Sequence, residues 1–175
     1  EWETPDQFAS TIGISTDSFQ AITELTVFAP NHPRLLALFA GACAAAGANI
    51  SGAHISTTRD GFALDTFLLA REFEDDADEM RRGRRVAETI EKVLKGDTRL
   101  GPLLAKRRQG KSVVNSFHVE PDVVINNALS DNFTVIEVAG RDRPGLLYEL
   151  TTALSDLSLD IASAHIATYG EKAVD

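Results

Sequence analysis

Residues 25–58 read LTVFAPNHPRLLALFAGACAAAGANISGAHISTT, and residues 136–169 read IEVAGRDRPGLLYELTTALSDLSLDIASAHIATY. The two stretches align without a gap, because Pro33 falls on Pro144 at an offset of 144 − 33 = 111 residues. The same offset superimposes two identical tripeptides, Ala53-His54-Ile55 and Ala164-His165-Ile166. A duplicated unit of this length predicts two copies of one small domain rather than a stack of short repeats.

Charge and cysteine content restrict the function. The 175-residue chain carries a formal net charge of −9, which argues against nucleic acid as the main partner. Its one cysteine, Cys43, excludes an internal disulfide and a cysteine-based metal cluster, so a reduced, cytoplasmic setting is expected. The longest apolar run, near residues 39–48, is too short and too rich in Ala and Gly to span a membrane.

The first copy alternates between strand and helix patterns. Leu25 and Val27 share one face of a β-branched strand, Pro33 suits the first turn of a helix, and Gly47 suits its end. The turn at residues 59–61 joins two further strands into a hairpin. The predicted elements are strand 23–28, helix 33–46, strands 50–58 and 62–70, helix 76–94, and a closing strand at 116–125.

This order predicts an α+β fold. A strand-helix-strand-strand-helix-strand sequence forms a four-stranded antiparallel sheet with two helices on one face. Residues 22–125 would be the first such domain, with a linker-like insertion at 97–115, and 126–132 a junction. Residues 133–175 would be the second, incomplete domain, and 1–21 a leader or the tail of a preceding domain. Pairing of the copies would cover their open edges.

The turn sequences PNHPRLL and GRDRPGLL, followed by GANI and SLDI, resemble those of ACT domains. That family has the ferredoxin-like βαββαβ fold and binds amino acids to regulate metabolic enzymes. The stretch from FHVEPDVV to the end of the chain, together with TELTVFAPNHPRLL, is similar to the tandem ACT region of a narrower family. These are the bifunctional enzymes that uridylylate the PII nitrogen-signalling protein and remove the uridylyl group.

The resemblance implies a glutamine-sensing regulatory region, with PII as a partner of the parent enzyme. It also implies a nucleotidyltransferase and a hydrolase domain elsewhere, which would need a divalent metal such as Mg²⁺. The residues themselves show no paired carboxylates, nucleophile–base spacing or metal cluster, so we expect no catalytic residue, metal or cofactor in this region. Two alternatives stay open: a sensor of another amino acid on a different enzyme, and a structural or dimerising ACT pair without ligand.

The candidate ligand site is the turn between the first strand and the helix. A helix N-terminus offers free amides and partial positive charge to a carboxylate, and Asn31 or Asp142 could hold the ammonium or side-chain amide. The resemblance adds the residues that open the second strand, Asn49 and Asp160. The alternative to ligand binding is a structural role. Asn31 and Asp142 would then only cap the helix, and Asn49 and Asp160 would only turn the chain. The candidate residues are Asn31, His32, Arg34, Leu35, Leu36, Asn49, Asp142, Arg143, Gly145, Leu146, Leu147 and Asp160.

The two copies differ at one position of this turn. The second has Gly145, which would let a ligand approach the backbone, whereas the first has Arg34. Either the first site is closed or Arg34 makes a charge-assisted contact of its own. We therefore expect the second copy, although incomplete, to hold the better site.

Three other features favour structural roles. We expect His54 and His165 to be interdomain or solvent-face residues rather than metal ligands. Cys43 is expected to be a buried structural thiol. The run of arginines at 81–85 is interpreted as a solvated helix face.

Overall fold

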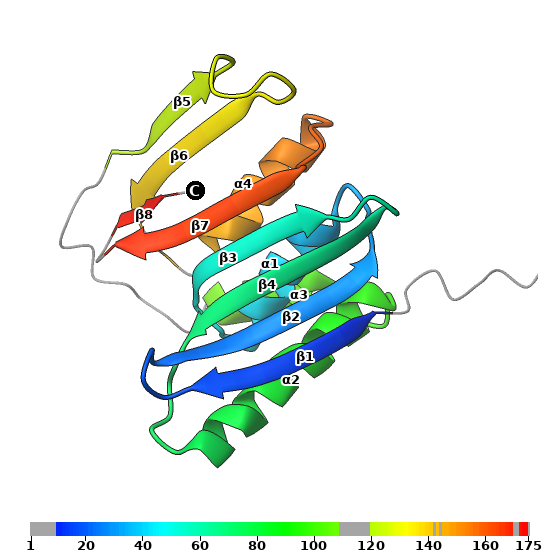
Figure 1. The fold of residues 1–175 in the computed structure, drawn as a ribbon. Coiled ribbons are helices and arrows are strands. Elements are labelled where there is room, and N and C mark those ends of the chain that lie inside the picture. Colours follow the sequence, from blue (N-terminus) through cyan, green and yellow to red (C-terminus); the bar gives the residue numbers. More distant parts are fainter. Residues whose placement is uncertain (1–9, 109–119, 142, 144, 170–171, 175) are drawn as a thin grey trace, which may run out of the picture.

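The computed structural model describes residues 10–108, 120–141, 143, 145–169 and 172–174. Within them, one eight-stranded sheet has the strand order β1-β2-β4-β3-β7-β8-β6-β5, with every neighbouring pair antiparallel (Figure 1). The elements are β1 (Thr11–Asp17), β2 (Ile22–Pro30), α1 (Leu35–Ala46), β3 (Ile50–Thr57), β4 (Phe62–Ala70), α2 (Asp76–Leu94), α3 (Leu100–Arg108), β5 (Asp122–Asn126), β6 (Val135–Arg141), α4 (Leu146–Asp156), β7 (Ser163–Tyr169) and β8 (Lys172–Val174).

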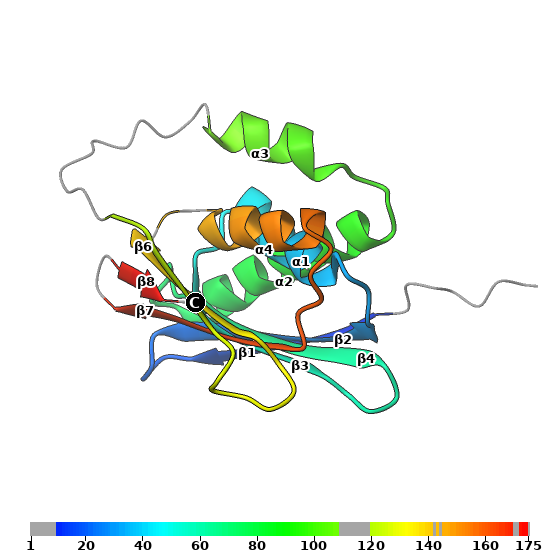
Figure 2. The ribbon, with the colours of Figure 1, turned by 90° about the horizontal axis from the view of Figure 1, so that it is seen from above.

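The helices lie on one face of the sheet (Figure 2). α1, α2 and α4 form the layer next to the strands, and α3 lies outside them. The predicted α+β class, with two ferredoxin-like copies of an antiparallel sheet, is confirmed. The predicted linker at 97–115 is not wholly irregular, because α3 occupies part of it and buries Leu100 against α1.

The prediction for the sheet's closing strand was wrong. Residues 122–126 do not close the first copy but pair with β6 of the second, while β1 takes the place beside β2. Thr11 pairs with Phe28 and Asp122 with Ala139, so β1 and β5 also obey the repeat offset, since 122 − 11 = 139 − 28 = 111. The repeated unit therefore begins one strand earlier than the sequence pattern indicated.

β1 lies within residues predicted to be a leader. Its alternation places Ile12 and Ile14 against the core, where they are partly buried. At the close contact with α2, a Cβ on Gly83 would lie 2.9 Å from a methyl of Ile14. β1 is thus an integral part of the first copy, whereas residues 1–9 lie outside the described part of the chain.

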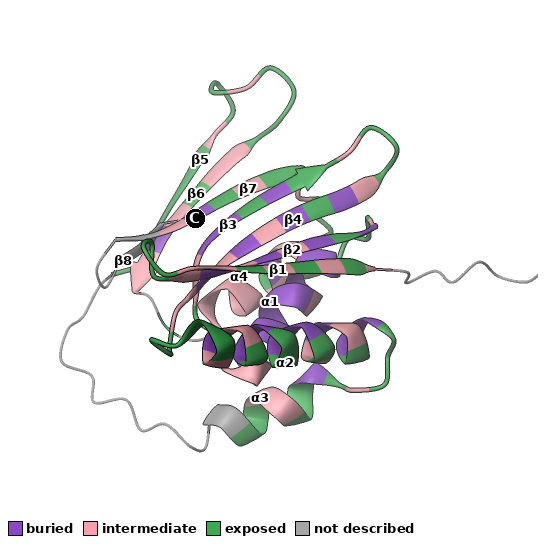
Figure 3. Cartoon of the chain, turned by 60° about the horizontal axis from the view of Figure 1, so that its bottom comes forward, coloured by how far each residue is buried: buried purple, intermediate pink, exposed green. Residues whose placement is uncertain are grey.

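The main core belongs to the first copy (Figure 3). Leu25 and Val27 lie on the inward face of β2, as predicted, and are fully buried. Phe39 of α1 meets Phe67 of β4 edge to face, with ring centroids 5.9 Å apart. Cys43 is also fully buried, and its burial raises the pKa of the thiol to about 12. The prediction of a buried thiol is confirmed, and the raised pKa keeps the thiol protonated at neutral pH.

The arginine run on α2 is only partly solvated, which corrects the prediction. Arg82 is 5% exposed and donates to the carbonyl of Ala70 at 3.0 Å and to the carboxylate of Glu79. Glu79 is itself enclosed and accepts hydrogen bonds from the Thr23 hydroxyl at 2.7 Å and the Phe73 amide at 3.1 Å. This buried network fixes the start of α2 to β2 and to the loop after β4.

Candidate functional site

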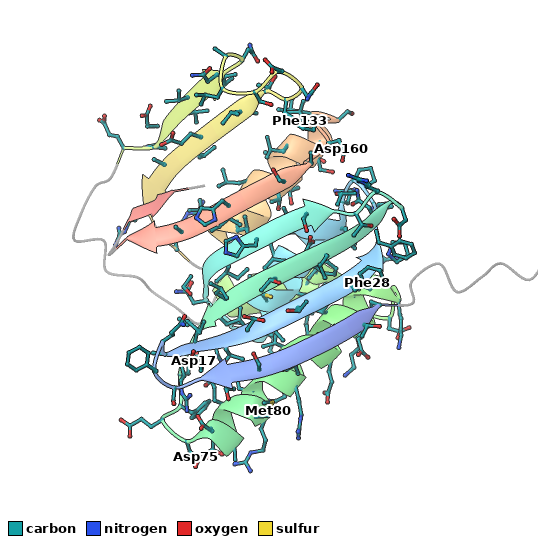
Figure 4. The ribbon with its side chains drawn as sticks, in the orientation of Figure 1. Asp17, Phe28, Asp75, Met80, Phe133 and Asp160 are labelled. Atoms are coloured by element: carbon teal, nitrogen blue, oxygen red, sulfur yellow. The ribbon has the colours of Figure 1, made fainter. Side chains whose placement is uncertain are left out.

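A hollow lies where the N-terminus of α1 meets the second copy. Together with its open mouth it holds about 330 Å³ of empty space, so it is a shallow, open hollow rather than an enclosed cavity. Two lining residues, Asp160 and Ile161, come from the second copy, and Figure 4 shows Asp160 where α4 turns into β7. The remainder belong to the first copy: Asn31, His32, Pro33, Leu35, Leu36, Ile55, Thr57, Ala63 and Asp65.

The turn before α1 is held by its own backbone. The Leu35 amide donates to the carbonyl of His32 at 2.8 Å, and the Arg34 amide donates to Nδ1 of His32 at 3.1 Å. These two amides are therefore engaged within the turn. Leu36 also lines the hollow, and its N–H is among the first four of the helix, which have no intrahelical acceptor. The Leu36 amide is thus the donor best placed for an anionic group.

Asn31 does not cap α1. The helix has no side-chain cap, and the Asn31 amide nitrogen instead donates to the Thr57 hydroxyl at 3.3 Å. Its backbone N–H donates to the carbonyl of Gly61 at 3.0 Å, which ties the turn to the β3–β4 hairpin. The side-chain oxygen of Asn31 remains as an acceptor at the edge of the hollow.

Asn49 and Asp160, the residues that open the second strand of each copy, lie in different surroundings. Asp160 joins the hollow of the opposite copy, whereas Asn49 does not line it. The Asn49 carbonyl accepts the amide of Ala70 at 2.9 Å, so it closes the sheet beside β4. The structure therefore brings the turn of the first copy together with the strand opening of the second.

Arg34 bridges the copies outside the hollow. Its Nη2 lies 3.7 Å from Oδ1 of Asp156 on α4, and both side chains are largely exposed. A solvated pair of this kind contributes little to stability. Arg34 is not among the residues that line the hollow, and its role toward a ligand stays a prediction.

The corresponding turn of the second copy is described in part, because Asp142 and Pro144 lie outside the described residues. The Leu146 amide donates to the carbonyl of Arg143 at 3.0 Å, repeating the Leu35–His32 bond at the 111-residue offset (143 − 32 = 146 − 35 = 111). A hydrogen bond to Glu149 of α4 raises the pKa of Arg143, which is thereby held along α4. Leu147 packs against the core.

Gly145 precedes α4 with φ of +87°, whereas its counterpart Arg34 has φ of −102°. We expect Gly145→Ala to lower the free energy of unfolding by about 1 kcal/mol, because an L side chain is strained in this left-handed conformation. A Cβ there would meet no atom within 4 Å, so the effect would come from the backbone alone. Urea unfolding should show no such loss for Gly140→Ala, which is equally open but has no positive φ. Equal losses would contradict the backbone explanation.

Asp65 was not found from the sequence. It lies on the inward face of β4, 1% exposed, and its Oδ1 has no hydrogen-bond partner. Burial raises the pKa of its carboxyl to about 7, although the Ser56 backbone amide opposes this. The sequence did contain a signal for its burial. Every second residue of a strand lies on the same face, so Asp65 shares the inward face with Ala63 and Phe67.

His54 and His165 face each other where the copies join. They are directly opposite in the antiparallel β3–β7 ladder, with Nδ1 atoms 3.4 Å apart and ring centroids 5.0 Å apart. Both are exposed, which confirms the interpretation as interdomain, solvent-face residues. Among the described residues, no three potential metal-binding side chains converge. No helix in the same ranges has the length and apolarity needed to cross a membrane.

The geometry and the sequence comparisons agree on the class of protein. Residues 23–82 match the family model of the ACT domain, so this chain contains an ACT domain, whose strand and helix order the second copy repeats. Over 164 residues, or 94% of its length, the chain is 57% identical to the bifunctional uridylyltransferase/uridylyl-removing enzyme of Bradyrhizobium diazoefficiens. It spans 18% of the length of that relative. No solved structure matches the chain significantly.

Proposed function

We propose that this chain is the glutamine-sensing regulatory region of an enzyme that uridylylates and deuridylylates the PII protein. ACT domains are regulatory small-molecule-binding domains, and the similarity to the bifunctional enzyme supports this parent activity. The observation that carries the proposal is the hollow at the N-terminus of α1, which both copies line.

The chemistry of the lining suits a free amino acid. The helix N-terminus and the Leu36 amide attract an α-carboxylate. Asn31 and Asp160 add a neutral and an anionic acceptor, which match the amide and ammonium donors of glutamine. Catalysis would take place in domains outside the matched region. Ligand binding to this region would change the activity of those domains.

Regulation follows from the shared lining. A ligand shifts an equilibrium between two arrangements only as far as it binds one of them more tightly. A ligand held by the turn of one copy and by Asp160 of the other favours the arrangement in which these two parts meet. Glutamine would thus stabilise the paired state seen here, and its loss would relax that state.

The test is calorimetric titration of glutamine into the full-length protein, with glutamate and serine as comparison ligands. Saturable heat for glutamine is expected, and Asp160→Ala should weaken its binding roughly tenfold to hundredfold, as for loss of a charged hydrogen-bond partner. Asp131→Ala is the matched control, because this exposed aspartate of the second copy does not line the hollow.

The same variants should be assayed for uridylyl transfer to PII with and without glutamine. Loss of the glutamine response in Asp160→Ala, but not in Asp131→Ala, would link the hollow to regulation. Selective binding of another amino acid would assign a different sensor. If no amino acid binds, the paired copies serve a structural role and the proposal fails.

A further inference from the structure

The carboxylate of Asp65 is the most unusual group in the hollow. It lies on β4 between Ala63 and Phe67 on the inward face, nearly fully buried, with Oδ1 unpartnered. An ionised carboxylate enclosed in this way is strongly disfavoured unless a positive group pairs with it. Without a cationic partner, Asp65 therefore keeps its proton.

The described residues that line the hollow give Asp65 no permanent cation. Its neighbours across the ladders are Val27 on β2 and Ile55 on β3, both apolar. Among the described residues that line the hollow, none is a lysine or arginine, and the titratable ones besides Asp65 are His32 and Asp160. α1 contributes Leu35 and Leu36 and the partial positive charge of its N-terminus.

We propose that Asp65 is a second counter-charge, beside Asp160, for the ammonium group of the bound amino acid, so that ligand binding expels the Asp65 proton. This inference rests on the proposed function, since it takes an amino acid as the occupant of the hollow. The ligand would place its carboxylate toward the Leu36 amide and its ammonium toward Oδ1 of Asp65. The proton balance is simple: the carboxyl loses one proton to solvent, and the ligand keeps its ammonium form.

The pH dependence follows from the burial that raises the pKa of Asp65 to about 7. Below that pH, Asp65 is mostly protonated and must ionise to bind the ammonium group, so affinity falls about tenfold for each pH unit. Above it, Asp65 is already ionised and affinity becomes independent of pH. Glutamine affinity should therefore rise between about pH 6 and pH 7.5 and then level off.

The experiment measures released protons directly. Glutamine is titrated into the full-length protein at pH 6 and pH 8, in buffers with different enthalpies of ionisation. Near pH 6 we expect close to one proton released for each ligand bound, and near pH 8 close to none. Asp65→Asn should bind at least tenfold more weakly at pH 8 and release no proton at either pH.

His32→Gln is the control for the other titratable group of the turn, and it should keep the proton release of the wild type. Loss of release in His32→Gln would assign the proton to His32 and overturn this inference. Binding of glutamine to the wild type without proton release at pH 6 would overturn it as well and leave the proposed function intact. If glutamine does not bind at any pH, both this inference and the proposed function are wrong. The wild-type and His32→Gln titrations decide the question even if Asp65→Asn does not fold.

Discussion

Replacing Glu79 by alanine is expected to lower the free energy of unfolding by about 3–5 kcal/mol, the range for breaking a buried ion pair. The substitution removes the acceptor of the Thr23 hydroxyl and of the Glu72 and Phe73 amides. It also leaves Arg82 buried with its charge uncompensated by Glu79. The loop after β4 and the first turns of α2 would lose their common anchor.

Urea denaturation of the wild type and two variants would measure this effect. Glu88→Ala is the matched control, because Glu88 lies on the same helix but is exposed. We expect it to change the unfolding free energy by less than about 0.5 kcal/mol, as at other surface positions. A loss below about 1 kcal/mol for Glu79→Ala would contradict the assigned role of the network.

The same network has a predictable response to acid. Burial alone would raise the pKa of Glu79, but hydrogen bonds from Thr23, the backbone amides of Phe73 and Glu72, and Arg82 outweigh it and lower the pKa. The stabilisation is therefore complete above the unfolded-state pKa of about 4.3 and is lost as the pH falls through the lower folded-state value. Between pH 6 and pH 3, the wild type should lose more stability than Glu79→Ala.

Replacing Gly41 by leucine is expected to lower the free energy of unfolding by about 1–3 kcal/mol through overpacking. Gly41 is buried in the middle of α1, where a Cβ would lie 2.6 Å from Leu100 of α3 and 2.8 Å from Tyr148 of α4. Leucine is the better helix former by less than about 1 kcal/mol, so the steric effect should dominate. Because Tyr148 belongs to the second copy, the substitution should also disturb the pairing of the copies.

Gly101→Leu is the control for Gly41→Leu. Gly101 also lies in a helix, but a Cβ there meets no atom within 4 Å. Thermal unfolding should rank the Gly41 variant clearly below the Gly101 variant. Calorimetry should also show weaker glutamine binding only in the Gly41 variant, since the hollow needs both copies in register. Equal stability of the two variants would show that α1 can move away without penalty.

Local patterns predicted most of the fold. Alternation identified the strands around Leu25 and Phe67, and helical periodicity with Gly47 as the terminator identified α1. The assignment of the edge strand failed because a short strand on either side of the unit satisfies the same pattern. Tertiary pairing with β2 decides between them, because the alternation of β1 rests on only two apolar residues, Ile12 and Ile14.

The candidate site was predicted less completely than the fold. The turn at residues 31–36 was identified, because Pro and the helix start are local signals. The meeting of this turn with Asp160 of the other copy depends on how β3 pairs with β7, which no local pattern encodes. Asp65 and Arg82 were missed because charged residues are usually exposed, and their burial depends on neighbours distant in sequence.

The β3–β7 ladder also carries information about how this chain arose. His54 pairs with its own counterpart, His165, in the centre of this ladder. On either side, Ala53 pairs with Ile166 and Ile55 with Ala164, as a two-fold axis through the histidine pair requires. Two separate copies of a single-domain ancestor could pair through this register as a symmetric dimer. Gene duplication and fusion would then replace an encounter between molecules with an intramolecular one, at an effective concentration on the order of millimolar. After such a fusion the two turns would not have to stay identical, and in this chain they differ, with Arg34 in one and Gly145 in the other.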